Sequence, residues 1–154
     1  MPLDQAFIGR EYPPTEPYEV GREKIREFAD AIHDGSALHR DPEAAKAAGH
    51  PDVIAPPTFA IILTMRAQDA LVDDPALGLD YSKVVHGNQR FTHHRPIRAG
   101  DRLRATVFVD DIKARAGNDF LTVRAEIGTV EGEPVCTALS TLVARGTAAE
   151  EEQA

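Results

Sequence analysis

The chain has 154 residues, 42% of them hydrophobic, and a formal net charge of −8 at pH 7. This length and composition suit one domain with its own hydrophobic core, and so acidic a chain is a poor candidate for general nucleic-acid binding. The single cysteine, Cys136, excludes an intrachain disulfide framework and a cysteine-rich zinc site.

Neither the apolar runs nor the N-terminal residues indicate a membrane protein or a secreted one. No stretch of about 18 consecutive apolar residues occurs, so we expect no membrane span. The N-terminus lacks a basic start followed by an apolar run, which argues against a secretory signal. With the cysteine count, this favours a reducing, cytoplasmic setting. We expect a single domain over residues 1–146, followed by an acidic flexible tail, residues 147–154, with three consecutive glutamates.

The first half of the chain is predicted to be helical. Residues 23–33 place apolar side chains at the spacing of one helix face. Asp41 followed by Pro42 is a typical helix start, and the short helix after it stops at Gly49. Residues 58–72 are the most apolar part of the chain, so we expect a helix buried on most sides. The side chains that we expect in the core are Phe59, Ile61, Ile62, Leu63 and Met65.

The pattern changes to strands from Val84 onward. Residues 84–97, 102–114, 119–132 and 134–146 are strand-like segments separated by turn-forming residues. Helices followed by such a meander predict an α+β fold with one long helix against an antiparallel sheet. A sheet of this kind has open edges, so we also expect the chain to form a dimer.

Residues 88–104, NQRFTHHRPIRAGDRLR, carry five arginines and a single acid in an otherwise acidic chain. One interpretation is a solvated strand edge. The other is a surface that receives phosphate or an acidic partner, because guanidinium groups bind both well. The candidates for that surface are Arg90, Arg95, Arg98 and Arg102.

Residues 33–41, HDGSALHRD, concentrate histidines and acids just after the first predicted helix. Asp34 and His39 are five residues apart, which on a regular helix would place them on different faces. In a turn, Gly35 would let both side chains face one pocket, where a carboxylate and an imidazole form an acid–base pair. The alternative is a polar turn in which Asp34 caps a loop and His39 is an ordinary surface residue.

Other chemistries have weaker support in the sequence. A metal site is conceivable because several histidines and acids are available, yet neither HExxH nor a Cys/His spacing occurs. The serine-hydrolase motif G-x-S-x-G is absent, as is a glycine-rich phosphate loop of dinucleotide or Walker type. Cys136 lies in a strand-like alternation and is expected to be packed. We therefore expect no metal and no cofactor.

Two segments resemble the MaoC-like dehydratase family. Residues 28–59, FADAIHDGSALHRDPEAAKAAGHPDVIAPPTF, resemble its hydratase-2 motif, and residues 90–103, RFTHHRPIRAGDRL, resemble its later strand and turn. The resemblance runs over residues 4–145 and looks closest to small actinobacterial-type subunits of (3R)-hydroxyacyl-carrier-protein dehydratases. It implies a hotdog fold, in which an antiparallel sheet wraps a long central helix.

The resemblance also implies an activity. Asp34 matches the family's catalytic aspartate and His39 its catalytic histidine. The implied reaction is reversible loss of water from a 3-hydroxyacyl thioester to give the trans-2-enoyl thioester. The implied partners are an acyl thioester of coenzyme A or of an acyl carrier protein, and a second MaoC-like chain in a homodimer or heterodimer.

The sequence departs from the family pattern at two places that shape the site. Ser36-Ala37 stands where the family has Asn-Pro. Pro56-Pro57-Thr58 stands where members that work alone have His-Gly, whose glycine region helps to form the oxyanion site. Proline has no N–H, so Thr58 N–H at the helix start would have to serve. This favours a non-catalytic subunit that shapes the acyl channel, and a thioester-binding module without turnover also stays open.

Overall fold

The structure, a computed structural model, describes residues 2–148. The predicted tail therefore lies outside the described residues, apart from Thr147 and Ala148. Thr147 is buried, and its hydroxyl donates to Asp119 Oδ2 at 2.6 Å. In the described part of the chain, no helix is long and apolar enough to cross a membrane.

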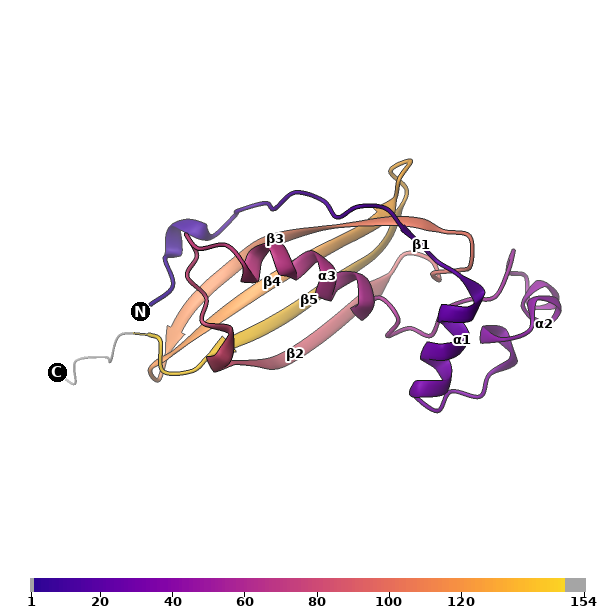
Figure 1. The fold of residues 1–154 in the computed structure, drawn as a ribbon, viewed down its shortest axis with the longest axis horizontal. Helices are drawn as coiled ribbons and strands as arrows, with labels where there is room; N and C mark the ends of the chain where they lie inside the picture. The colour runs from indigo at the N-terminus through magenta and orange to yellow at the C-terminus, as the bar shows by residue number, and fades with distance from the viewer. Residues whose placement is uncertain (1, 149–154) are drawn as a thin grey trace.

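Within residues 2–148, five strands form one antiparallel sheet in the order β1-β3-β4-β5-β2 (Figure 1). The strands are β1 Tyr18–Glu19, β2 Val84–His93, β3 Arg102–Arg115, β4 Asn118–Thr129 and β5 Pro134–Ala144. The four long strands match the four predicted segments, whereas β1 is too short to leave a pattern in the sequence. β2 forms one edge of the sheet, because it pairs with β5 alone among the described strands.

Helix α3, Ile61–Val72, lies across one face of the sheet and contacts β3 and β4 (Figure 1). Its buried residues meet the inward-facing residues of the strands, which alternate with outward-facing ones as the sequence predicts. Along β4, the inward side chains are each at most 2% exposed: Leu121, Val123, Ala125 and Ile127. A long helix against a curved antiparallel sheet is the α+β hotdog fold.

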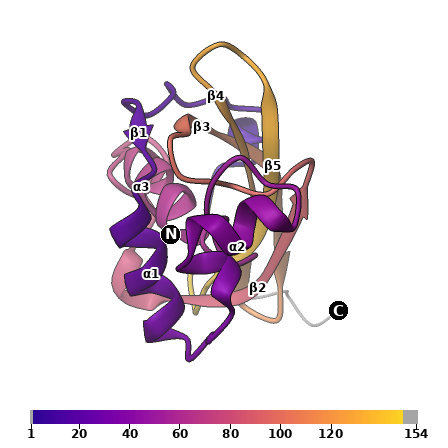
Figure 2. The same cartoon turned by 90° about the vertical axis from the view of Figure 1, so that its right-hand side faces the viewer.

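The other helical segments gather beyond one end of the sheet (Figures 1 and 2). They are α1 Arg22–Ala31, the 3-10 turn η2 Ala37–His39 and α2 Pro42–Ala47; short 3-10 turns also occur at η1 Gln5–Phe7 and η3 Tyr81–Lys83. Helix α2 begins as predicted, with the Asp41 side chain accepting from the N–H of Glu43 at 2.9 Å. This end of the molecule carries the segment 33–41.

Two details of the central helix differ from the sequence prediction. It begins at Ile61 rather than at residue 58, because Pro56 and Pro57 cannot donate hydrogen bonds and the chain makes turns before the helix. Met65, which we expected in the core, is 54% exposed. Met65 does not pack against the sheet, and its side chain instead faces an open cavity between α3 and β2.

Candidate active site

The end of helix α1 sets the position of Asp34. His33 adopts a left-handed conformation with φ of 59°, which allows the N–H of Asp34 to bond the carbonyl of Ala29 at 2.8 Å and the N–H of His33 to bond the carbonyl of Asp30 at 3.1 Å. These two hydrogen bonds together form a Schellman motif at the C-terminus of α1. We expected Gly35 to make this turn, but the residue in the left-handed conformation is His33, and Gly35 has no positive φ.

Asp34 and His39 face each other. Asp34 Oδ2 lies 3.0 Å from His39 Nε2, and Asp34 Oδ1 accepts from the backbone N–H of Ser36 at 3.1 Å. The other ring nitrogen of His39, Nδ1, lies 2.6 Å from the backbone oxygen of Ile54. His39 is 6% exposed, so the alternative in which it is an ordinary surface residue was wrong.

The hydrogen-bond partners of Asp34 and His39 indicate which of their atoms carry hydrogens. The carbonyl of Ile54 can only accept, so Nδ1 of His39 carries a hydrogen. The contact between Nε2 and the Asp34 carboxylate then requires a second proton shared between them. The N–H of Ser36, donating to the carboxylate, lowers the pKa of Asp34 below its ordinary value, and the charge of His39 acts in the same direction. Asp34 is therefore the carboxylate member of the pair.

The neighbouring side chains hold the turn itself. The hydroxyl of Ser36 accepts from the N–H of Leu38 at 3.3 Å and so caps the 3-10 turn η2. The guanidinium of Arg40 donates to the backbone oxygen of Asp34 and to the carboxylate of Asp30. These hydrogen bonds hold the backbone of the turn between Asp34 and Arg40 in one conformation.

The pair opens into a cavity of about 660 Å³. Its walls come from the turn that carries Asp34 and His39, from the extended segment before α3 and from the end of β2. The lining residues are Asp34, Ser36, Leu38, His39, Ile54, Ala55, Pro57, His93, His94, Arg95, Pro96 and Ile97. The cavity thus combines an acid–base pair at one place with mostly apolar walls elsewhere. Such a cavity suits a ligand that has one small polar reacting group and is otherwise apolar.

The proline step lies between this cavity and a neighbouring one. Pro57 lines the cavity with Asp34, and Thr58 lines the next. The carbonyl of Pro57 accepts from His93 Nε2 at 2.7 Å, and the N–H of Thr58 has no acceptor among the described residues. Thr58 N–H is therefore the backbone donor that stays available at this step.

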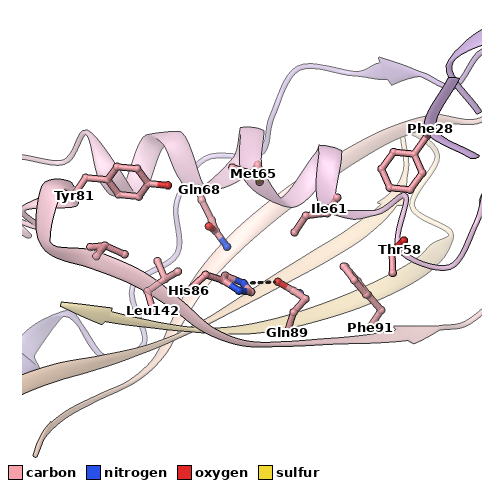
Figure 3. A pocket seen from close by; sticks show the side chains of 11 residues that line it. Phe28, Thr58, Ile61, Met65, Gln68, Tyr81, His86, Gln89, Phe91 and Leu142 are labelled. Atoms are coloured by element: carbon pink, nitrogen blue, oxygen red, sulfur yellow. Dashed lines mark hydrogen bonds between the residues drawn. The ribbon is translucent and has the colours of Figure 1, made fainter. Parts of the chain in front are cut away.

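The neighbouring cavity, of about 500 Å³, runs between α3 and β2 (Figure 3). Near Thr58 its walls are apolar, with Phe28, Ile61 and Phe91 facing inward (Figure 3). The remaining lining residues are Met65, Gln68, Tyr81, Val84, His86, Gln89 and Leu142. Because Phe91 and His93 are two apart on β2, the same face of that strand serves both cavities.

The candidate arginines fall into two groups. Arg95 donates to both carboxylate oxygens of Asp101 at 2.9 Å and to Glu133 at 2.8 Å, and its side chain is only 14% exposed. Its charge is therefore neutralised within the protein. Arg90 and Arg102 are exposed and Arg98 is half-buried at the turn before β3.

Asp101, the single acid of the arginine-rich segment, has a structural role that the sequence alone does not predict. Asp101 is buried, and besides pairing with Arg95 it accepts from the N–H of Arg98 at 2.9 Å. The role of Ile54 is not predictable from its residue type either, because it depends on the backbone oxygen. Among residues 2–148 no three or more His, Cys, Asp or Glu side chains are grouped to hold a metal ion.

Comparison with known proteins gives consistent matches. The family model described as FAS1-like, dehydratase domain region, matches residues 6–138. A protein of Saccharopolyspora erythraea named UPF0336 protein is 81% identical over 152 residues, covering 99% of this chain and 97% of that protein.

Solved structures match over most of this chain. A MaoC-like dehydratase has a TM-score of 0.84 and 36% identity, covering 91% of this chain and 42% of that one, so this chain spans less than half its length. A complex of C-terminally truncated HadBC (3R-Hydroxyacyl-ACP Dehydratase) from Mycobacterium tuberculosis has a TM-score of 0.79 and 32% identity, covering 89% of this chain and 96% of that chain.

Proposed function

Because the chain belongs to the FAS1-like dehydratase domain region family, we propose that it is a hydro-lyase that interconverts (3R)-hydroxyacyl and trans-2-enoyl thioesters. The observation that carries the proposal is the 3.0 Å contact between Asp34 Oδ2 and His39 Nε2 at the wall of a cavity that adjoins an apolar one. The pair supplies acid–base chemistry, and the apolar cavity suits an acyl chain.

In the proposed dehydration, the Asp34–His39 pair removes a proton from C2 of the substrate and gives a proton to the departing 3-hydroxyl. The C2–H and C3–O bonds break, the C2=C3 bond forms, and water leaves. Since the pair holds one shared proton, it gives one and receives one, and each turnover returns it to its starting state. Hydration is the same sequence in reverse.

The thioester oxygen gains negative charge during this reaction. A backbone N–H aimed at it stabilises the transition state. Pro57 has no N–H, so we assign this role to the N–H of Thr58, which is without another acceptor in the described part of the chain. Losing one such donor lowers turnover by about 10²–10³-fold in enzymes that depend on it.

A second candidate function rests on the same proline step. With fewer N–H donors than the family pattern supplies, the chain would serve as a subunit that forms the acyl channel beside a catalytic MaoC-like chain. The HadBC structure that this chain resembles is a complex, and the long edge strand β2 offers a surface for pairing. A thioester-binding module without turnover is the third reading, and the assay below separates all three.

We propose that the acyl carrier binds at the arginine surface, which is formed by Arg90, Arg98 and Arg102. These residues lie on β2, in the turn after it and at the start of β3, near the cavity wall formed by residues 93–97. Coenzyme A phosphates and the acidic face of a carrier protein both suit guanidinium groups. Arg95 has a structural part instead, because Asp101 and Glu133 neutralise it.

The test is an assay of trans-2-enoyl thioester hydration by the purified chain. The reaction is monitored as the loss of the absorbance of the conjugated enoyl group. The assay is run alone and with a MaoC-like chain that has an intact His-Gly step. Full turnover alone supports the self-sufficient enzyme, and a large gain on mixing supports the subunit. Thioester binding without turnover in either arrangement contradicts the hydro-lyase and leaves the binding module.

A further inference from the structure

The cavity between α3 and β2 is not apolar along its whole length. On α3 the residues that face it, Ile61, Met65 and Gln68, follow helical spacing, and Gln68 is the polar member of this row. Gln68 points from the helix toward the strands, and His86 and Gln89 face it from β2 (Figure 3). Polar side chains therefore interrupt the apolar wall partway along the cavity.

These polar groups lie at one level of the fold. Gln68 Nε2 donates to the hydroxyl of Ser140 at 3.0 Å, and Ser140 is 3% exposed. Ser140 on β5 is directly opposite Gln89 on β2 in the strand register. Gln68, Ser140 and Gln89 thus form a band across α3, β5 and β2, which we call the amide band. Phe91 lies on the side of the amide band nearer to the cavity of Asp34 and His39, and Leu142 lies on the other side of the band.

The amide band has unused hydrogen-bonding capacity. Within residues 2–148, Gln68 Oε1 has no donor, while Gln89 Oε1 is bonded by His86 Nε2 at 3.1 Å and the Gln89 amide N–H group makes only a long contact of 3.5 Å to the backbone of Arg90. A plain hydrocarbon passing the band would leave these amide groups unpaired and removed from water, which is unfavourable.

We propose that the acyl cavity selects chains that carry a hydroxyl group at the level of the amide band; this inference rests on the proposed function. A hydroxyl both donates and accepts a hydrogen bond, so one placed between the two side chains can donate to Oε1 of Gln68 and accept from the amide N–H group of Gln89. The substrate class is then a thioester with a second oxygen function along its chain.

The register of β2 gives the depth of this hydroxyl. Gln89 precedes His93, which lines the cavity with Asp34 and His39, by four residues, or roughly 13 Å of strand. Carbon–carbon bonds are about 1.5 Å long and bent at each atom, so the hydroxyl lies on the order of ten bonds from the reacting carbons. A short acyl chain does not reach the band.

The test measures binding of saturated straight-chain coenzyme A thioesters to the full chain by calorimetry. One hydroxyl is moved stepwise along the acyl chain, and the unsubstituted thioester of equal length is the reference. We expect affinity to peak at one interior position, roughly 10- to 100-fold above its neighbours, because the amide groups that the bound chain covers gain a partner there. Gln68→Met should remove the peak, whereas Met65→Leu should keep it.

The outcomes separate this inference from the proposed function. Affinity that does not depend on hydroxyl position, or a peak that survives Gln68→Met, overturns the amide band alone. If no coenzyme A thioester binds, the amide band is overturned, and the enoyl hydration assay described above decides the proposed function separately. If Gln68→Met misfolds because Ser140 loses its donor, the double variant Gln68→Met/Ser140→Ala removes the buried hydroxyl as well, and the peak should be absent in it.

Discussion

His39 Nδ1 and the backbone oxygen of Ile54 lie 2.6 Å apart, so the orientation of the imidazole depends on the strand-like segment that contains Ile54. That segment is held in turn by the loop after β2, because the N–H of Ala55 donates to the carbonyl of Ile97 at 2.7 Å. A backbone oxygen in this position determines that Nδ1 carries a hydrogen and holds the ring in one orientation. The loop after β2 therefore helps to position His39 through the segment that contains Ile54 and Ala55.

Replacement of Asp101 should affect both stability and His39. Asp101 holds Arg95 by two hydrogen bonds in a nearly buried setting, and removing one partner of such a pair costs about 3 kcal/mol. We expect Asp101→Asn to lower the free energy of unfolding by about this amount and to shift the ring nitrogen signals of His39 in NMR spectra. Glu133→Gln, at the exposed side of Arg95, is the control and should cost much less stability, because solvent screens an exposed ion pair. Unchanged His39 signals in a destabilised Asp101→Asn would disprove the positional link.

The Ser36 N–H should control the pKa of Asp34. Ser36 has φ of −60° and ψ of 133°, which proline can adopt, so Ser36→Pro removes the donor that lowers the pKa of Asp34 most. We expect this pKa to rise in NMR titration, while Ser36→Ala, which keeps the N–H, leaves it low.

The same depressed pKa makes a prediction about stability. Asp34 contributes stability that is present above the unfolded-state pKa of about 3.9 and lost as pH falls through the folded-state value. Urea denaturation of the parent chain should therefore show a loss on acidification that is smaller in Ser36→Pro. Equal acid sensitivity of the two chains would count against the assigned donor.

His33 carries backbone strain at the end of α1. Its left-handed conformation, with φ of 59°, costs a non-glycine residue on the order of 1 kcal/mol. We expect His33→Gly to raise the free energy of unfolding by roughly 1 kcal/mol, whereas His33→Ala retains the strain and should not. Thermal and urea denaturation of the three chains measure this, and a destabilised His33→Gly would show that the histidine side chain matters more than the backbone.

Charge reversal at the arginine surface should weaken carrier recognition. We expect Arg98→Glu/Arg102→Glu to raise the KM for the thioester several-fold at low salt, and the difference to shrink as salt screens the charges. Arg115→Glu at the opposite end of β3 is a matched control, because Arg115 is also exposed. A KM that stays the same in the double variant would remove this surface from the proposal.

The amino-acid sequence predicts the fold well because the core is built on simple periods. Alternation along β4 and the apolar run of α3 each specify which face is buried. The prediction that Met65 lies in the core was wrong, because the sequence does not distinguish an apolar residue on an open side of a helix from one in the core. Strand β1 was not predicted, because two residues carry no period.

The site could be predicted only in part, for a physical reason. Asp34 and His39 stand out by residue type, and a turn between helices can bring them together. The groups that fix them are mostly backbone atoms, such as the N–H of Ser36 and the carbonyl of Ile54, and every residue type supplies these. The amide band likewise depends on the register of Gln89 with Ser140, which follows from strand pairing and not from either residue alone.

The most direct test of the central claim is the effect of Asp34→Asn on hydration of a short trans-2-enoyl thioester, measured in whichever arrangement of chains turns over. Asp41→Asn is the matched control in the same turn, because asparagine caps helix α2 as well as aspartate does. The account predicts at least about 10²-fold lower kcat for Asp34→Asn with an unchanged fold, and unchanged kcat for Asp41→Asn. Full turnover by Asp34→Asn would contradict it.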